Sequence, residues 1–408
     1  MQLSISKNII EETIQLPASK SESNRALLIE ALAHFQGVQS FKTQLSNISE
    51  ARDTQTLQRL LASEDKTLDV LDAGTTMRFL TAFCAATNRE AILTGTPRMK
   101  ERPIHILVEA LNELGAKIEY LEQKGFPPIH IKGFKQIKKH IEVESNVSSQ
   151  YISALLMIAP VLEEGLQITL KNAVASKPYI EMTLALMSHF GIRYVWDHHK
   201  ISIEPQKYHL QPYTIESDWS AASYWYSVVA IAKQATIFLP HLKENSLQGD
   251  KDITEIMKSF GVETTFEKEG VFITKTENTI LEKQTYDFTN CPDLAQTIVA
   301  LCVAKNIEFV AKGVESLKIK ETNRLLALQN EVAKFGFDFQ EQTDGSWLLK
   351  KNKDIENKNT IQIHTYEDHR MAMAFAPLAM LYPLGIEQPE VVNKSYPHFW
   401  QEIKKLSI

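Results

Sequence analysis

Three residues that could hold an anion lie close together near the start of the chain. Lys20, Ser21 and Arg25 follow an extended Leu-Pro pair and enter a run of apolar residues at helical spacing. With Ser23 as the expected cap, they cluster at a helix N-terminus, where free N–H groups and the helix dipole favour negative charge. Lysine, serine and arginine suit a phosphate or a carboxylate at such a place. A capped surface helix with ordinary charges fits this stretch equally well.

Comparable residues recur wherever a turn opens an apolar helix. The expected caps, separated by about 73 residues after a shorter first interval, are Ser23, Thr76, Ser149, Ser220, Asp293 and Asp368. Other residues of interest lie beside these caps or in the loops that enter each second helix: Gly74, Arg98, Ser148, Gln150, Ser176, Tyr179, Lys320, Glu321, Arg324, Arg370 and Lys394. Arg25, Arg78 and Arg370 follow a cap by two residues, where the helix dipole disfavours a cation, so we expect a ligand anion to compensate them. Any one charge alone is more commonly a solvated surface residue, but their recurrence favours an anion site.

Two carboxylates stand among these cations. Asp293 could simply cap a helix, and Glu321 could simply form an i,i+3 ion pair with Arg324. In a site lined by cations, however, a pair of carboxylates is what proton transfer requires. The sequence contains no phosphate-binding glycine loop, dinucleotide fingerprint, metal-ligand spacing or nucleophile elbow, so its motifs predict no metal site.

The elements that would position these residues form a unit repeated six times. Each repeat has the pattern strand, helix, strand, helix and two further strands. Four of the second helices end at a glycine, namely Gly115, Gly191, Gly261 and Gly336. The first and last repeats lack their final hairpin. Strands at residues 2–6 and 13–16 would form a spare hairpin, which we expect to complete the sixth repeat and bring the termini together.

Six such repeats predict an α/β protein with two similar domains of three repeats each. One domain would comprise residues 1–16 and 214–408, and the other residues 17–213. The net charge of −6 argues against a nucleic-acid partner. The longest uncharged run, residues 371–386, is too short to span a membrane and contains two prolines. Without a signal peptide, a CxxC pair or any indication of a dimer interface, we expect a cytoplasmic monomer.

Eight ordered motifs resemble the 5-enolpyruvylshikimate-3-phosphate synthase family: LPASKSESNRAL, LDAGTTMRF, LTGTPRMKERPI, VSSQ, ASKPYI, PDLAQTIVAL, IKETNRL and EDHRMAMAF. The resemblance covers essentially the whole chain. It implies two domains of three βαβαββ repeats, an inside-out α/β barrel, with the active site in the cleft between them. It also implies transfer of the enolpyruvyl group of phosphoenolpyruvate to the 5-hydroxyl of shikimate 3-phosphate, with release of phosphate and without a metal or other cofactor. This reaction belongs to aromatic amino-acid biosynthesis.

The resemblance assigns roles to individual residues. Shikimate 3-phosphate would contact Lys20, Ser21, Arg25, Ser148, Ser149, Gln150, Ser176, Tyr179, Asp293 and Lys320. Phosphoenolpyruvate would contact Lys20, Gly74, Arg98, Gln150, Arg324, Arg370 and Lys394. As catalytic residues we expect Glu321 to handle the proton at C3, Asp293 to orient and deprotonate the 5-hydroxyl, and Lys20 to assist the leaving phosphate.

Two other functions stay open. The first is the sister enolpyruvyl transferase that acts on UDP-N-acetylglucosamine, although its motif has Lys-Asn where this chain has Lys20-Ser21, and it usually carries a reactive loop cysteine. The second is a non-catalytic anion-binding scaffold built on the same repeats. A scaffold would be expected to lack Asp293, Glu321 or Lys20, and all three are present.

Overall fold

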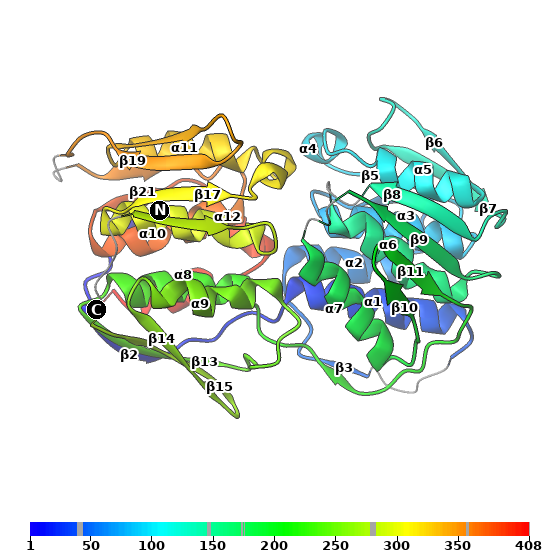
Figure 1. Cartoon of the computed structure of the whole chain (residues 1–408), viewed down its shortest axis with the longest axis horizontal. Helices are drawn as coiled ribbons and strands as arrows, with labels where there is room; N and C mark the ends of the chain where they lie inside the picture. Colours follow the sequence, from blue (N-terminus) through cyan, green and yellow to red (C-terminus); the bar gives the residue numbers. More distant parts are fainter. Residues whose placement is uncertain are drawn as a thin grey trace. The chain divides into compact units, whose positions relative to one another are not determined.

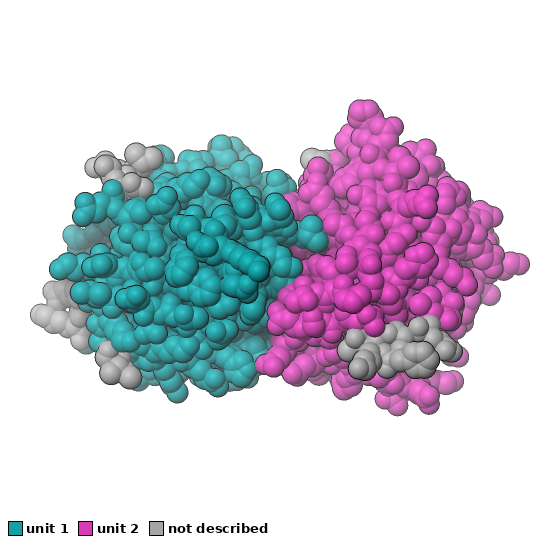
Figure 2. All heavy atoms as spheres, turned by 90° about the horizontal axis from the view of Figure 1, so that it is seen from below, with its two compact units in different colours: residues 1–18, 216–408 teal, residues 19–215 magenta. Residues whose placement is uncertain are grey.

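The chain crosses twice between two units of similar size. In the computed structural model, which describes residues 1–38, 44–144, 148–172, 174, 176–277, 283–355 and 359–407, unit 1 comprises residues 1–18 and 216–408, and unit 2 comprises residues 19–215 (Figure 2). The crossing segments lie side by side, because Ala18 and Ser217 form an antiparallel bridge and the Asp218 N–H donates to the Pro17 carbonyl at 2.9 Å. The sequence predicts each crossing two residues earlier than the structure has it.

Unit 2 contains one short repeat and two complete ones. The short repeat consists of β12 (Tyr213–Thr214), α1 (Lys20–Phe35), β3 (Leu45–Ser46) and α2 (Arg52–Ala62). The second consists of β4 (Thr67–Asp69), α3 (Gly74–Ala86), β5 (Ala91–Thr94), α4 (Pro97–Lys100), α5 (His105–Leu114), β6 (Ala116–Tyr120) and β7 (Ile129–Phe134). The third consists of β8 (His140–Glu144), α6 (Ser149–Ile158), η1 (Ala159–Val161), β9 (Leu166–Lys171), α7 (Lys177–His189), β10 (Val195–Asp197) and β11 (Lys200–Ile203).

Unit 1 contains the other three repeats. The fourth consists of β2 (Ile9–Thr13), α8 (Trp219–Ile231), β13 (Gln234–Pro240), η2 (Gly249–Asp252), α9 (Ile253–Lys258), β14 (Val262–Glu267) and β15 (Gly270–Lys275). The fifth consists of β16 (Lys283–Asp287), η3 (Pro292–Leu294), α10 (Ala295–Lys305), β17 (Glu308–Lys312), η4 (Glu315–Ile319), α11 (Arg324–Ala333), β18 (Phe337–Glu341) and β19 (Trp347–Lys351). The sixth consists of β20 (Ile361–Ile363), α12 (His369–Phe375), η5 (Ala376–Met380), β21 (Leu384–Ile386), η6 (Pro389–Lys394), α13 (Phe399–Lys404) and β1 (Gln2–Leu3).

Every complete repeat builds its sheet in the same order. The first strand pairs parallel with the second, and the last two strands form an antiparallel hairpin beside them, as in β4-β5-β7-β6 and β16-β17-β19-β18. A helix connects the two parallel strands, which is the connection that parallel pairing requires. The predicted hairpins β14–β15 and β18–β19 are confirmed.

The N-terminal segment does not form the predicted hairpin. β1 pairs antiparallel with β21 in the sixth repeat, whereas β2 pairs parallel with β13 in the fourth. Each strand thereby closes a sheet edge that would otherwise be open. β12 does the same beside β3, so the strand before each crossing stays in its own unit. The Met1 ammonium group donates to the Ile386 carbonyl at 2.7 Å and Ser407 Oγ donates to the Ser4 carbonyl at 3.2 Å, so the two ends of the described chain lie together as predicted.

Helices fill the centre of each unit and the sheets lie outside them (Figure 1). In unit 1, α8, α10 and α12 pack against one another, and nearly all of their residues are buried. In unit 2, α3 packs against α1 and α6 in the same way. A helix that is buried on all sides is expected to be mostly apolar around its whole circumference.

Most helices begin at a different residue from the one predicted. Ser19 Oγ accepts from the Glu22 N–H, so α1 begins at Lys20 and Ser23 lies inside it. Asp368 is confirmed as a cap, since its carboxylate accepts from the Arg370 N–H at 2.8 Å. The other predicted caps are wrong: the residues before α3, α6, α8 and α10 are Ala73, Ser148, Asp218 and Leu294. In the helices α1 and α3, this moves Lys20 and Gly74 to the first helical position, closest to the free N–H groups.

The four glycines predicted to follow second helices all have positive φ, as expected at helix ends. At Gly115 a Cβ atom would lie 2.0 Å from the Lys135 carbonyl oxygen, so only glycine fits this turn. Among the residues described, no helix has both the length and the apolar character needed to cross a membrane.

Candidate active site

Lys20 lies at a junction of three helix starts in unit 2. Its Nζ is 3.0 Å from Asp53 Oδ2 in the first turn of α2, and both side chains are largely buried. Thr76 Oγ1 in α3 donates to the Asp53 carbonyl at 3.2 Å. The first turns of α1, α2 and α3 are therefore joined around Lys20. Asp53 escaped the sequence analysis because an acidic residue in a first helical turn is ordinary.

Arg25 is a buried arginine with neutral hydrogen-bond partners. Its Nε donates to Thr183 Oγ1 at 2.7 Å, Nη2 to Ser153 Oγ at 3.1 Å and Nη1 to the Ser21 carbonyl at 2.8 Å. Ser153 belongs to α6 and Thr183 to α7, so these bonds tie three helices together near their N-terminal ends. Within the described part of the chain, no carboxylate lies within ion-pair distance of this guanidinium.

The surroundings of Arg25 leave its positive charge poorly compensated. Burial lowers the pKa of the guanidinium to about 10, against weak opposing effects of Tyr179 and Glu22. Its Cζ lies 5.5 Å from the centre of the Phe79 ring and 5.7 Å from that of Tyr179. Because an uncompensated buried charge is costly, an anion beside this guanidinium would be stabilised.

The serines predicted to bind phosphate lie at the starts of two neighbouring helices. Ser148 caps α6, with its Oγ accepting from the Gln150 N–H at 3.3 Å, and Ser149 is the first helical residue. Ser176, with a φ of 55°, comes directly before α7. Since α6 packs against α7, the geometry offers hydroxyl and N–H donors of the kind that phosphate prefers.

Gly74 allows an arginine to approach the start of α3. A Cβ atom at this position would lie 2.7 Å from both terminal nitrogens of Arg102, a largely buried residue. Gln150 Nε2 lies 3.4 Å from Thr75 Oγ1, beside the same helix start. Arg98, the residue chosen from this loop in the sequence analysis, lies in α4 and pairs with Glu101 at 2.9 Å. Arg98, Lys100 and Arg102 belong to one loop, and sequence alone does not rank these three cations.

The structure gives Arg78 a different partner from the ligand anion expected for it. Its Nη1 donates to the Gly74 carbonyl at 3.2 Å and its Nη2 to the Pro103 carbonyl at 2.7 Å. These bonds connect the start of α3 to the loop that carries Arg102. The recurrence of arginine after a helix start therefore has a structural cause in this copy.

In unit 1, Arg324 is surrounded by three carboxylates. The guanidinium, whose side chain is 2% exposed, lies 2.8 Å from Asp293 Oδ1, 2.9 Å from Glu321 Oε2 and 2.7 Å from Asp368 Oδ2. Burial opposes the charged form, but the three carboxylates outweigh it and raise the pKa of Arg324 above its ordinary value. The ion pair that sequence spacing suggested between Glu321 and Arg324 is present. Asp368 was predicted only as a cap, so its second role was missed.

Asp293 joins Arg324 to Arg370. Its second oxygen, Oδ2, lies 2.8 Å from Arg370 Nη2. Burial works against ionisation, yet Arg370, Lys320 and Arg324 together hold the pKa of Asp293 well below its usual range. Asp293 is therefore an ionised carboxylate shared by two buried guanidinium groups, rather than the plain helix cap that sequence also allowed.

A strained loop places the residues at the start of α12. Tyr366 and Glu367 both have positive φ, near 55°, which is uncommon for residues with a side chain. The Tyr366 hydroxyl donates to the buried Glu331 carboxylate at 2.8 Å and holds this loop. This strained loop leads directly into α12, so that Asp368 at the N-cap and Arg370 in the first turn lie side by side.

The remaining predicted cations of unit 1 are Lys320 and Lys394. Lys320 precedes Glu321, and its charge acts on Asp293. Lys394, at the end of η6, is 1% exposed. Counting Arg324, Arg370, Lys320 and Lys394 against Asp293, Glu321 and Asp368 gives four cations and three carboxylates. Within the residues that the structure describes, no group of three or more histidine, cysteine or acidic side chains could hold a metal ion.

Comparison with known proteins places the chain among enolpyruvyl transferases. A sequence model described as EPSP synthase (3-phosphoshikimate 1-carboxyvinyltransferase) matches residues 35–403. The 3-phosphoshikimate 1-carboxyvinyltransferase of Bacteroides fragilis (strain YCH46) is 48% identical over 398 residues, which cover 97% of this chain and 95% of the relative. That of Haemophilus influenzae (strain PittEE) is 34% identical over 435 residues, which cover 98% of this chain and 97% of the relative.

Solved structures confirm the predicted fold class. The EPSP synthase of Acinetobacter baumannii superimposes with a TM-score of 0.77 at 21% identity, covering 100% of this chain and 98% of that protein. The fold is thus the two-domain inside-out α/β fold with repeated βαβαββ units. Together with the sequence matches over nearly the full length, this shows that the chain belongs to the EPSP synthase family.

Proposed function

We propose that this protein transfers the enolpyruvyl group of phosphoenolpyruvate to the 5-hydroxyl of shikimate 3-phosphate and releases phosphate, in the biosynthesis of aromatic amino acids. Membership of the family supports the reaction. The observation that carries the assignment to particular residues is the shared carboxylate of Asp293 between two buried arginines, Arg324 and Arg370. Such an arrangement can bind an anionic substrate and move a proton beside it.

Shikimate 3-phosphate would be held largely by unit 2. Arg25 would pair with the substrate carboxylate, because its hydrogen-bond partners among the described residues are neutral. Ser148, Ser149 and Ser176 would hold the 3-phosphate at the starts of α6 and α7. The remaining proposed contacts are Lys20, Ser21, Gln150, Tyr179, Asp293 and Lys320.

Phosphoenolpyruvate would be held mainly by arginine and lysine side chains. Arg324 and Arg370 would bind its carboxylate through paired N–H groups. The other proposed contacts are Lys20, Gly74, Arg98, Gln150 and Lys394, to which the position of the Arg102 guanidinium beside Gly74 adds a further candidate.

The reaction would proceed by addition and elimination. Glu321 gives a proton to C3 of phosphoenolpyruvate, the 5-hydroxyl oxygen bonds to C2, and Asp293 takes the hydroxyl proton. In the second step the bond from C2 to the phosphate oxygen breaks, Lys20 supplies a proton to the leaving phosphate, and C3 returns its proton to Glu321 as the double bond forms again. No metal is required in this scheme, because fixed cations stabilise the developing negative charge.

Substrate binding would also activate the two carboxylates. In the ligand-free protein, Asp293 and Glu321 accept hydrogen bonds from Arg324, and this weakens them as bases. When a substrate carboxylate occupies the arginine N–H groups, the protein carboxylates lose part of that stabilisation, so their pKa values rise. The rise would make Asp293 a stronger base and would let Glu321 take up the proton that it later gives to C3, both only when phosphoenolpyruvate is present.

The burial of all three cysteines argues against the activity of the sister transferase. Cys84, Cys291 and Cys302 are all buried as free thiols. Burial raises the pKa of Cys84 to about 12 and also raises the pKa values of Cys291 and Cys302. A reactive cysteine requires the opposite, an exposed thiol with a lowered pKa. We further propose that the protein is a cytoplasmic monomer. Its buried, reduced thiols agree with the reducing conditions of the cytoplasm.

Acceptor-dependent phosphate release tests the proposal. Purified protein is incubated with phosphoenolpyruvate and either shikimate 3-phosphate or UDP-N-acetylglucosamine, and free phosphate is measured over time. The proposal predicts release with shikimate 3-phosphate only. Release with the UDP-sugar would establish the sister activity, and no release with either acceptor would favour the anion-binding scaffold.

A further inference from the structure

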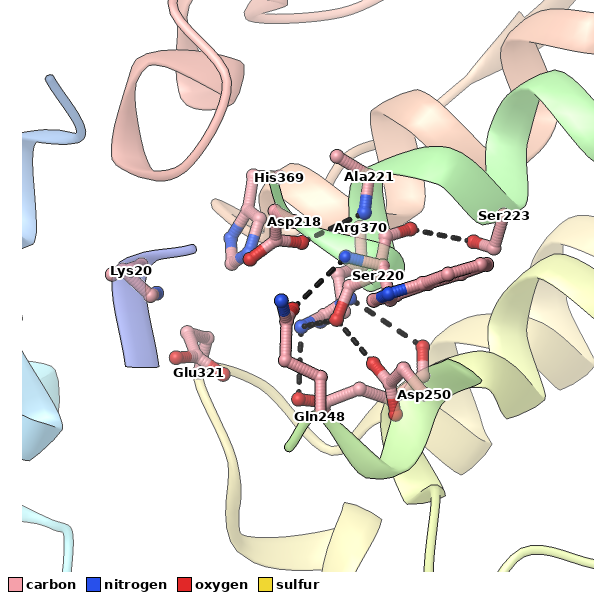
Figure 3. A network of polar contacts seen from close by, with 12 residues as sticks. Lys20, Asp218, Ser220, Ala221, Ser223, Gln248, Asp250, Glu321, His369 and Arg370 are labelled. Carbon is pink, nitrogen blue, oxygen red and sulfur yellow. Dashed lines mark hydrogen bonds and ion pairs between the residues drawn. The ribbon is translucent and has the colours of Figure 1, made fainter. Parts of the chain in front are cut away.

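A second buried carboxylate, Asp250, lies behind Arg370 and has no place in the reaction scheme above. Asp250 belongs to η2 and is 3% exposed. Its Oδ2 contacts Ser220 Oγ at the start of α8, and Ser220 Oγ accepts from Arg370 Nη2 at 3.3 Å. Figure 3 shows these three side chains in line, with Ser220 between the carboxylate and the guanidinium. Arg370 Nη2 also binds Asp293 at 2.8 Å, so Asp250 reaches the proposed catalytic base through two intermediates.

The surroundings of Asp250 favour its neutral form. Its Oδ1 is buried and has no hydrogen-bond partner among the described residues. An ionised carboxylate with one bare oxygen in a buried place is costly, whereas a protonated one can donate to Ser220 Oγ. Burial and the nearby negative charge of Asp293 raise the pKa of Asp250 to about 7, against the opposing effect of Arg370.

The two charge states of Asp250 have different consequences for Arg370. When Asp250 is protonated, it donates to Ser220 Oγ, the serine oxygen accepts from Arg370, and no negative charge lies behind the guanidinium. When Asp250 is ionised, the Ser220 hydroxyl turns to donate to it, and a second anion besides Asp293 faces the positive charge of Arg370. The second state weakens the attraction of Arg370 for any further anion.

We propose that Asp250 is a positioning residue that retains a proton and, through Ser220, keeps the charge of Arg370 available to the carboxylate of the enolpyruvyl donor. This inference rests on the proposed function, since it concerns the donor site of that reaction. It predicts that donor binding weakens as Asp250 loses its proton, and that a neutral residue of the same shape removes this part of the pH dependence.

Other ionisable groups face Asp250 and must be separated from it. Asp252 belongs to the same element, Asp218 caps α8, and Cys291 and Asp293 come from the segment around η3. Burial raises the pKa of Cys291, so it stays a thiol, whereas Asp293 stays ionised. His369, next to Arg370 on α12, and the phosphate of the donor are further ionisable groups of the comparison. A comparison of wild type with Asp250→Asn at each pH cancels the contributions that the two proteins share.

The experiment measures the KM and, by direct titration, the Kd of phosphoenolpyruvate for wild type and Asp250→Asn from about pH 5.5 to about pH 8.5. We expect the ratio of wild-type to variant Kd to rise from near unity at the acidic end to about tenfold at the basic end, with kcat changed by less than about threefold. In a Ser220→Ala background, the Asp250→Asn change should no longer alter this pH profile, because the link to Arg370 is gone. A ratio that stays constant with pH would overturn the proposal.

Unfolding experiments provide a readout that needs no activity. A carboxyl group whose folded-state pKa is raised contributes stability below its unfolded pKa and loses it as the pH rises through the folded value, about 7 here. As the pH rises from acidic to basic values, the free energy of unfolding of Asp250→Asn should therefore increase relative to that of wild type. An equal change at all pH values would show a merely structural role and contradict the proposal. If the wild type shows no acceptor-dependent phosphate release, the proposed function fails, whereas the Kd and unfolding comparisons still decide the role of Asp250.

Discussion

Two buried arginines should respond in opposite ways to the same substitution. Arg25 and Arg324 are each 2% exposed or less, but Arg25 has neutral hydrogen-bond partners whereas Arg324 has three carboxylates. Replacing each by methionine retains most of the side-chain length without the charge. We predict that Arg25→Met leaves the folded state almost as stable as before while shikimate 3-phosphate binding is largely lost. Arg324→Met should have a much lower free energy of unfolding than the wild type.

The magnitude for Arg25 follows from its surroundings. Burial lowers the Arg25 pKa to about 10, which corresponds to a penalty of about 3 kcal/mol on the charged form. The substitution recovers this penalty, and burial of the methionine side chain adds about 2 kcal/mol. Against this stand three hydrogen bonds from a charged donor, about 1.5 kcal/mol each at the weaker end of their range. The balance lies within about 1 kcal/mol of zero.

The groups left behind differ between the two variants. Without Arg25, Thr183 Oγ1 still donates to the Tyr179 carbonyl at 2.7 Å and lies 2.8 Å from Ser153 Oγ, so neither hydroxyl becomes unpaired. Without Arg324, the carboxylates of Asp293, Glu321 and Asp368 lose a shared counter-ion. Breaking a buried ion pair on one side costs about 3–5 kcal/mol.

Denaturant unfolding and calorimetric titration with shikimate 3-phosphate would measure both effects. Loss of a buried charge-assisted contact to the substrate carboxylate should weaken binding to Arg25→Met by about 100-fold. Arg25→Lys is the matched control: it keeps the charge and should keep part of the affinity. The reasoning would be refuted if Arg25→Met were as unstable as Arg324→Met, or if it bound shikimate 3-phosphate normally.

Two further predictions concern the chemical step and the donor site. Asp293→Asn should lower kcat by about 100-fold or more without a large rise in the KM of phosphoenolpyruvate, because the proton acceptor is lost while Arg370 stays available; a fall of less than about tenfold in steady-state assays would disprove the base role. Gly74→Ala should raise the KM of phosphoenolpyruvate by about tenfold while costing less than about 1 kcal/mol of stability, because the new Cβ displaces only the flexible end of Arg102; an unchanged KM would argue against a donor site there.

Sequence reasoning predicted the repeat architecture well because the signals are local. Alternating strands, helix-ending glycines and hairpin turns each depend on neighbouring residues, so β14–β15, β18–β19 and the glycine turns appear where expected. The N-terminal hairpin failed because β1 and β2 find separate open sheet edges, which only the folded units provide. The helix starts failed for a related reason. Several Ser, Thr and Asp residues precede each helix, and tertiary packing selects among them.

The site was predicted in its residue types but not in its pairings. Glu321 was expected beside Arg324, and Asp293 was expected in a site lined by cations, yet the bridge from Asp293 to Arg370 joins the fifth repeat to the sixth and leaves no trace in local spacing. Asp53 was missed for the same reason, since its contact with Lys20 joins the first turns of two helices, and the approach of Arg102 to Gly74 is equally invisible in local spacing. Asp250 lacked any signal, because one aspartate in a polar loop is indistinguishable from a solvated residue until its burial is known.

The central claim is that this protein adds the 5-hydroxyl of shikimate 3-phosphate to C2 of phosphoenolpyruvate while a proton is delivered to C3. Turnover in deuterated water, followed by phosphorus and proton magnetic resonance, observes both events at once. We expect one phosphate released for each enol ether formed at the 5-position, with deuterium appearing in the methylene group of the product, because C3 becomes a methyl group in the intermediate. Phosphate release without that ether, or an ether whose methylene carries no deuterium, would contradict it.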